Sequence, residues 1–147
     1  MDVTYYGHST VELTIKDTSI LIDPFITPNP HTDALVDHLD PDIILVSHGH
    51  QDHIADAKAI AAQSKADVIT NFEIANWLQE RGIETTTPVN HGGTVETDVA
   101  DFTYINAVHS SVLPDGTYGG NPGGFIIQTD TETVYFSGDT ALHTDMK

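Results

Sequence analysis

A short apolar run that ends directly in a group of histidines is the feature that most restricts how this chain can fold. Residues 43–46 are Ile-Ile-Leu-Val, a continuous run typical of strands that are buried on both faces of a sheet. The next residues are Ser-His-Gly-His-Gln-Asp-His, ending at His53. Sites of α/β proteins lie where buried strands end in loops. The sequence therefore predicts a functional site directly after this strand.

Four side chains of this segment are suited to binding metal ions: His48, His50, Asp52 and His53. Imidazole nitrogens and carboxylate oxygens bind Zn, Mn, Fe or Co, and the chain has no cysteine that would provide a thiolate site. His48 and His50 are two residues apart, so on an extended loop they project to the same side. Asp52 and His53 follow at the start of a helix, which directs them toward a second metal position. A polar loop with histidines present by chance is the alternative, and it does not explain this spacing.

The other predicted elements indicate one α/β domain over residues 1–147, β-rich at both ends and helical in the middle. Residues 54–65, rich in alanine and lysine, predict a helix. A second helix is predicted over residues 72–81, with Asn71 as its N-cap and Gly82 as its stop. β-branched, aromatic and alternating residues predict the strands, which are residues 3–6, 10–16, 19–22, 43–46, 68–70, 94–96, 102–108, 124–129 and 133–136.

The charge balance argues against polyanionic partners. The chain has 5 basic and 22 acidic residues, a net charge of −17, which repels the phosphate backbone of nucleic acids. No stretch approaches the roughly 20 apolar residues of a membrane span, and the N-terminal MDVTYYGHS lacks the basic and apolar regions of a signal peptide. The expected partner is a small-molecule substrate, with no nucleic acid and no membrane, and the expected location is the cytoplasm.

The segment SHGHQDH matches the His-x-His-x-Asp-His motif of the metallo-β-lactamase superfamily, which the chain resembles over essentially its whole length. GHST, LIDPF, INAVHSS and SGDTALHTDMK resemble one branch in particular, the uncharacterised metal-dependent hydrolases related to the ascorbate-6-phosphate lactonases. The resemblance implies two similar halves packed as an αββα sandwich. It also implies an enzyme whose metal-bound hydroxide attacks an ester, lactone or phosphoester of a small metabolite.

The resemblance further implies roles for single residues. It implies two divalent cations, zinc with manganese or iron as alternatives. The implied ligands of the first cation are His48, His50 and His109, and those of the second are Asp52, His53 and a later histidine. Asp139 would be shared by both cations. Asp23 matches the buried acid that supports the ligands. Asp52 and His8 are the candidate catalytic residues, and His8, in a Gly-His-Ser turn, would bind substrate or relay a proton. Structural hydrogen bonds, turn caps and core packing are the alternative roles for Asp23, His8, His109 and Asp139.

The sequence departs from this superfamily at its C-terminal end. The chain ends at Lys147, and the final histidine of the superfamily has no counterpart. The second half of the sandwich is therefore expected to be truncated, with an exposed edge near residues 133–136 and a second metal site that lacks one ligand. Two further readings stay open: a catalytically inactive metal-binding module, and a nuclease of the same superfamily, which the net charge disfavours. The resemblance also implies that the chain can form homo-oligomers.

Overall fold

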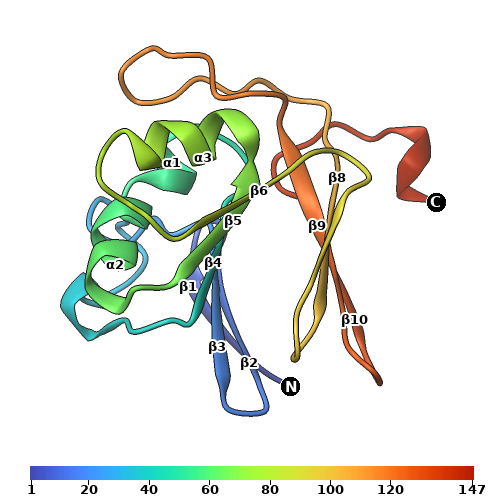
Figure 1. Ribbon diagram of the computed structural model, residues 1–147, viewed down its shortest axis with the longest axis horizontal. Coiled ribbons are helices and arrows are strands. Elements are labelled where there is room, and N and C mark those ends of the chain that lie inside the picture. The colour runs from blue at the N-terminus through green and yellow to red at the C-terminus, as the bar shows by residue number, and fades with distance from the viewer.

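Two β-sheets packed face to face form the centre of the molecule, and helices cover the outer face of the first sheet (Figure 1). This computed structural model describes residues 1–147. The first sheet, sheet A, has the order β1-β2-β3-β4-β5-β6, antiparallel from β1 to β3 and parallel from β3 to β6. Its strands are β1 (Asp2–Gly7), β2 (Thr10–Ile15), β3 (Thr18–Ile22), β4 (Ile43–Leu45), β5 (Asp67–Asn71) and β6 (Thr86–Val89).

The second sheet, sheet B, is an antiparallel meander with the order β10-β9-β8-β7. Its strands are β7 (Thr94–Glu96), β8 (Asp101–Asn106), β9 (Gly123–Gln128) and β10 (Thr133–Phe136). The helices are α1 (Gln51–Ile54), α2 (Ala57–Ser64) and α3 (Phe72–Gln79), with the short 3-10 turns η1 (Val36–His38) and η2 (Thr144–Met146). None of these helices has the length and apolar character that crossing a bilayer requires.

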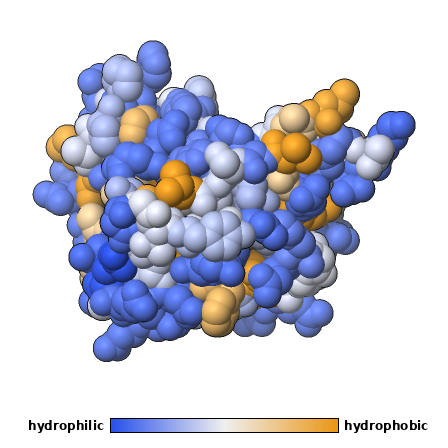
Figure 2. Space-filling model, turned by 90° about the horizontal axis from the view of Figure 1, so that it is seen from above, coloured by the Kyte–Doolittle hydropathy of each residue, from blue (hydrophilic) through white to orange (hydrophobic).

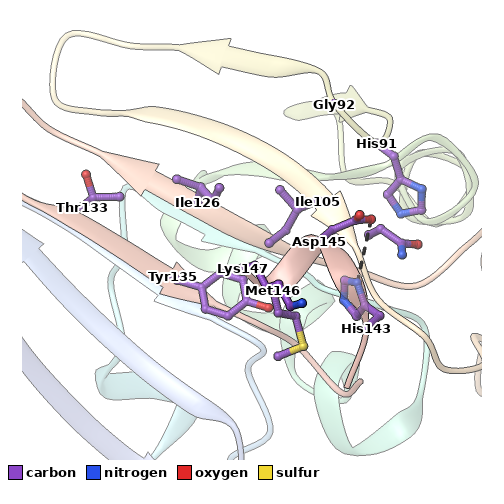
Figure 3. A pocket seen from close by; sticks show the side chains of 11 residues that line it. His91, Gly92, Ile105, Ile126, Thr133, Tyr135, His143, Asp145, Met146 and Lys147 are labelled. Atoms are coloured by element: carbon purple, nitrogen blue, oxygen red, sulfur yellow. Dashed lines mark ion pairs between the residues drawn. The ribbon is translucent and has the colours of Figure 1, made fainter. Parts of the chain in front are cut away.

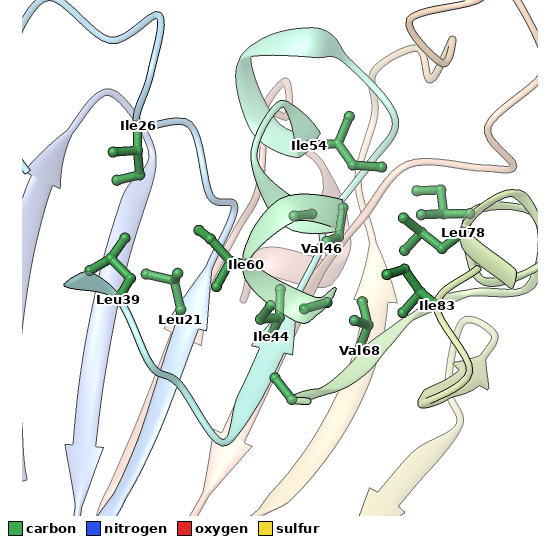
Figure 4. Close-up of a cluster of buried hydrophobic side chains, with 14 of the residues drawn as sticks. Leu21, Ile26, Leu39, Ile44, Val46, Ile54, Ile60, Val68, Leu78 and Ile83 are labelled. Carbon is green, nitrogen blue, oxygen red and sulfur yellow. The ribbon is translucent and has the colours of Figure 1, made fainter. Parts of the chain in front are cut away.

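The apolar side chains form two clusters, one on each face of sheet A. The cluster between sheet A and the helices includes Ile44, Val68 and Ile60, and Figure 4 shows them interleaved. The cluster between the sheets includes Leu45 from β4 and Phe102 from β8. Because neighbouring residues of a strand face opposite sides, Ile44 and Leu45 belong to different clusters. The prediction that residues 43–46 form a strand buried on both faces is confirmed, since all four side chains are buried.

Asp52 and His53 lie at the start of a helix, as predicted, but the predicted helix over residues 54–65 is two helices. α1 begins at Gln51, and α2 begins at Ala57 after a break at Asp56. The Asp56 carboxylate accepts hydrogen bonds from the backbone N–H groups of Ile26 and Thr27 at 2.6 and 2.9 Å, so the break ties the loop after β3 to the helix layer. Asp52 and His53 consequently lie within the first helical turn.

Strand β6 was not predicted, because Pro88 lies within it. Proline lacks the N–H group that a central strand needs, and it is tolerated in edge strands. β6 is the edge strand of sheet A and runs parallel to β5, with Pro88 opposite Thr70. Pro88 argues against a central strand but is compatible with this edge position.

The outer face of sheet B carries a groove of about 530 Å³, separate from the histidine-rich segment (Figure 3). Ile105, Ile126 and Tyr135 come from three strands of this face, and the last residues of the chain fold across it. Tyr135 is 46% exposed, in agreement with the expected exposure of the β10 edge. The face seen in Figure 2 is largely hydrophilic with separate apolar patches, in keeping with the net charge of −17.

Replacing Asn71 with alanine is expected to destabilise the fold by about 2–3 kcal/mol. The buried Asn71 caps α3, since its Oδ1 accepts from the N–H of Ile74 at 2.9 Å, and its Nδ2 donates to the carbonyl of Gly119 at 2.8 Å. The substitution removes the predicted cap and one of the two hydrogen bonds that the carbonyl of Gly119 accepts, the other coming from Ser111 Oγ. Urea unfolding measures the effect, with the exposed Asn90→Ala as the control, and equal stability of the two variants would contradict this account.

Candidate metal centre

Three imidazoles converge at the end of the buried strand β4. His48 and His50 follow β4 in sequence, and His109 follows β8 on the neighbouring sheet. One nitrogen of each ring lies within 4.8 Å of the others, and the distance from His48 Nε2 to His50 Nδ1 is 3.1 Å. Two lone pairs this close repel each other unless a proton or a cation lies between them. The predicted first ligand set is thus brought together in space.

A second group lies beside the first and consists of His8, Asp52 and His53, whose ligand atoms are also within 4.8 Å of one another. Asp52 and His53 lie on α1, and His8 lies in the turn between β1 and β2. His53 is fully buried, whereas His8 and Asp52 are partly exposed at the rim. The rings of His48 and His53 are 4.1 Å apart between centroids, so the two groups are in direct contact.

Asp139 faces both groups with the same oxygen atom. Its Oδ2 lies 3.5 Å from His53 Nε2 and 3.7 Å from His109 Nε2. It follows β10, where the chain turns back toward the end of β4. A carboxylate oxygen between two sets of imidazole nitrogens has the position of a group that bridges two cations.

The buried Asp23 supports both groups from behind. Its Oδ1 accepts from the N–H of Ser47 at 2.7 Å, and its Oδ2 accepts from Ser47 Oγ at 2.6 Å and from His53 Nδ1 at 2.8 Å. Since a carboxylate only accepts, His53 carries its proton on Nδ1. The Ser47 hydroxyl gives its proton to Asp23 and so accepts from His48 Nδ1 at 2.9 Å. Both histidines therefore present Nε2 lone pairs to the centre, as ligands supported by a second carboxylate do.

The surroundings of His48 and His50 keep these rings neutral. Burial, followed by the neighbouring imidazoles of His53, His50 and His109, lowers the pKa of His48 to about 2. Burial and the imidazole of His109 also lower the pKa of His50. Because a neutral imidazole is the form that binds a metal, these two side chains do not need to lose a proton near neutral pH.

His53 is in the opposite situation, and its outer nitrogen has no partner. Burial tends to lower its pKa, but the hydrogen bond and charge of Asp23, together with Asp139 and Asp52, raise the pKa above its ordinary value. The Nε2 atom is buried and makes no hydrogen bond. An unpartnered buried nitrogen surrounded by carboxylates is a position that favours a positive charge. This residue set therefore fits a bound cation.

Several residues that hold this loop were not predicted from the sequence. Tyr104 donates from its hydroxyl to the carbonyl of Ser47 at 2.7 Å. Ser111 accepts from the N–H of Gly49 at 3.0 Å and donates to the carbonyl of Gly119 at 2.9 Å. The inward position of Tyr104 in the alternating strand β8 is the only sequence signal for such a role.

The remaining histidines lie outside the centre. His31 and His38 are exposed. His91 stacks on Tyr104 with a centroid distance of 5.0 Å and contacts the carbonyl of Pro122. His143 lies in the groove of sheet B (Figure 3). Every residue predicted for the metal centre is therefore in the cluster, and these four histidines are not.

The sequence model of a protein family described as the beta-lactamase superfamily domain matches residues 18–147 of this chain. The chain belongs to the beta-lactamase superfamily. Among relatives in this superfamily, it is 49% identical to a UPF0173 metal-dependent hydrolase of Methylacidiphilum infernorum and 48% identical to one of Christiangramia forsetii. Both matches cover all of this chain and 66% of the relative. The chain thus spans just under two thirds of the length of these relatives.

Solved structures share the fold of this chain. Igni18, described as a novel metallo hydrolase from the hyperthermophilic archaeon Ignicoccus hospitalis, has a TM-score of 0.86 at 31% identity, over 98% of this chain and 63% of its own. A protein of Veillonella parvula, described as a possible metal-dependent hydrolase, has a TM-score of 0.78 at 22% identity, over 98% of this chain and 64% of its own. The expected metallo-β-lactamase fold is confirmed over the residues of this chain.

The loop that carries Ser111 is pinned to α3 by Asp115, which gives a pH-dependent prediction. Asp115 Oδ2 accepts from Trp77 Nε1 at 2.8 Å and from the guanidinium of Arg81 at 2.6 Å. The indole hydrogen bond, followed by the N–H of Thr117, lowers the pKa of Asp115 from 3.8 to about 2. Because this pKa is depressed, the contacts stabilise the fold above pH of about 4 and are lost as the pH falls toward about 2.

Fluorescence of Trp77, the single tryptophan, is expected to report this protonation with a midpoint at a pH of about 2. Asp115→Asn is the control, and it should abolish the transition while far-ultraviolet circular dichroism shows whether the chain stays folded. A midpoint near the ordinary carboxyl value of about 4, with the fold intact, would contradict the proposed contacts.

Proposed function

We propose that this chain carries the centre of a metal-dependent hydrolase that uses two divalent cations. The observation that carries the proposal is the position of Asp139, whose Oδ2 faces His109 of one ligand group and His53 of the other. A structural metal site needs one closed set of ligands. Two adjacent sets with a shared carboxylate are instead the arrangement of two-cation hydrolytic centres.

The ligand groups are exposed on one side only, which gives the substrate its direction of approach. Asp23, His48 and His53 are fully buried, whereas Asp52 and Asp139 are partly exposed. When bound, the cations would lower the pKa of a water molecule, to about 7 for one Zn²⁺, and would polarise the bond to be cleaved. The buried Asp23 would hold the ligands in fixed orientations, and the partly exposed Asp52 and Asp139 would face the substrate.

The proposed substrate is an ester, a lactone or a phosphoester of a small metabolite. The relatives and the similar structure from Ignicoccus hospitalis are named hydrolases, which supports the reaction class for this chain. The ligand groups consist of histidine and aspartate side chains, so the bound cations would provide the positive charge that attracts an anionic substrate. The five basic residues also disfavour the alternative of a nuclease, because phosphate contacts need cations. An inactive metal-binding module is the second alternative.

Hydrolysis by metal-free chain and by chain reloaded with Zn²⁺, Mn²⁺ or Fe²⁺ tests the proposal. A panel of simple esters, lactones and phosphoesters is assayed with wild type, Asp139→Ala and the exposed control Asp98→Ala. We expect activity that requires added metal and falls more than about 100-fold in Asp139→Ala alone. Metal binding without hydrolysis of any panel member would favour the inactive module, and equal activity of all three proteins would contradict the proposed site.

A further inference from the structure

The second ligand group contains a residue that resemblance to the superfamily does not assign to a metal. We propose that His8 is a ligand of the second divalent cation and completes a three-residue set with Asp52 and His53. This inference rests on the proposed function, because it requires that a cation is bound there. It differs from the substrate contact or proton relay expected of His8.

The distances within the group fit neighbouring ligands of one cation. Zinc binds imidazole nitrogen and carboxylate oxygen at about 2.0–2.2 Å, so adjacent atoms of a tetrahedral site lie about 3.3 Å apart. His8 Nε2 is 3.0 Å from Asp52 Oδ2. His53 offers one ring nitrogen to this group, in which no two ligand atoms are more than 4.8 Å apart. Nε2 is its free nitrogen, because Asp23 holds Nδ1. Small side-chain rotations bring all three atoms to ligand distances.

An ordinary His8–Asp52 ion pair is the competing explanation, and it leaves His53 unexplained. An ion pair needs only two partners, and it would satisfy His8 and Asp52 alone. The buried Nε2 of His53 belongs to the same group and makes no hydrogen bond. The Nδ1 proton of His53 is held by Asp23, so the free Nε2 lone pair faces the group. A cation satisfies all three atoms at once, which a proton between two of them does not.

The backbone of His8 is held in an unusual conformation that fixes the ring in this place. His8 has φ of +54°, in the left-handed region that costs a non-glycine residue of order 1 kcal/mol or more. The Tyr5 hydroxyl donates to the carbonyl of His8 at 2.8 Å. The His8 ring packs edge-on against Phe25 and His53, with centroid distances of 5.5 and 5.1 Å. Strain of this kind persists where the surrounding structure fixes the residue, and it is frequent at functional sites.

The charge of the group also suits a divalent cation. Two neutral imidazoles and the Asp52 carboxylate carry one negative charge, and Asp139 adds a second carboxylate next to His53. The first group has three histidines and no carboxylate of its own. Asp139 is therefore the shared anion, and His8 gives the second group the same number of protein ligands as the first.

The test measures how many metal ions this chain binds, by titration with Zn²⁺ or Co²⁺ and by elemental analysis after removal of free metal. His8→Gly and His8→Asn are the informative variants, because glycine and asparagine tolerate a positive φ. His31→Ala, a change at an exposed histidine, is the control. We expect wild type and control to retain two metal ions per chain, and both His8 variants to retain one. In the titration, the affinity of the variants for the second metal ion should be weakened more than about 100-fold. Added imidazole should restore the second equivalent and its Co²⁺ absorption in His8→Gly.

The outcomes separate this inference from the proposed function. Two equivalents with unchanged affinities in both variants would show that His8 is not a ligand, while the hydrolase proposal would stand. A single equivalent in wild type that is unaffected by His8→Gly would also overturn the inference. If the wild-type chain bound no metal ion, both proposals would be overturned. Retention of the first equivalent in the variants shows that they are folded, so the loss of the second is not a folding defect.

Discussion

Replacing Asp23 with asparagine is expected to lower the free energy of unfolding by about 3–5 kcal/mol and metal affinity by about 10–100-fold. Asp23 is fully buried, and its Oδ2 accepts from both Ser47 Oγ and His53 Nδ1. The amide of asparagine has a single acceptor oxygen and cannot replace both oxygens. If the amide oxygen takes the place of Oδ2, the N–H of Ser47 loses its acceptor. If it takes the place of Oδ1, Ser47 Oγ and His53 Nδ1 both lose theirs, and the orientation of the ligands is lost.

Asparagine is the informative substitution because Asp23 has φ of +47°. Asparagine tolerates this conformation better than alanine, so the lost hydrogen bonds are measured without added backbone strain. Asp98→Ala, at an exposed carboxylate, controls for the change of net charge. Urea unfolding gives the stability, and zinc titration gives the affinity. Unfolding and binding equal to those of the control would show that Asp23 does not support the ligands.

Replacing Gly138 with alanine is expected to destabilise the fold by about 2–5 kcal/mol and to remove the bridging position of Asp139. Gly138 has φ of +58°, and an added Cβ would lie 2.3 Å from the carbonyl oxygen of Gly123 and 3.1 Å from Ser47 Cβ. A backbone oxygen at that distance cannot move aside without disturbing β9. The neighbouring Asp139 would therefore shift away from His53 and His109, which it now approaches to 3.5 and 3.7 Å.

Gly116→Ala is the matched control, because Gly116 has φ of +85° and nothing lies within 4 Å of an added Cβ. This variant carries the left-handed penalty without the steric overlap. Urea unfolding of both variants separates the two effects, and metal titration shows whether the second equivalent is lost in Gly138→Ala only. Equal destabilisation by the two substitutions would mean that the contact with Gly123 is not a constraint.

The ligand-rich segment was predictable because its chemistry is local. The apolar run before Ser47 and the spacing of His48, His50, Asp52 and His53 are visible in the eleven consecutive residues 43–53. His109 and Asp139 were reached by resemblance rather than by physical derivation, since no local pattern shows that residues so far apart in sequence meet at the end of β4. The structure brings them within a few ångströms because β8 and β10 end beside this loop.

The features that the sequence did not show depend on contacts between distant segments. Asp56 divides a predicted helix because it binds the loop at residues 26–27, and β6 tolerates Pro88 because it lies at the sheet edge. The approach of His8 to Asp52 joins the first hairpin to α1. Periodicity and propensity describe single elements, whereas these three features are set by how the elements pack.

The most direct test of the two-cation centre is anomalous X-ray diffraction at the zinc absorption edge, measured on crystals of this chain grown with Zn²⁺. The account predicts two anomalous peaks, one within bonding distance of His48, His50 and His109 and one within bonding distance of Asp52 and His53, with Asp139 between them. Absence of anomalous density from this cluster in zinc-loaded crystals, or peaks only at surface carboxylates, would contradict it.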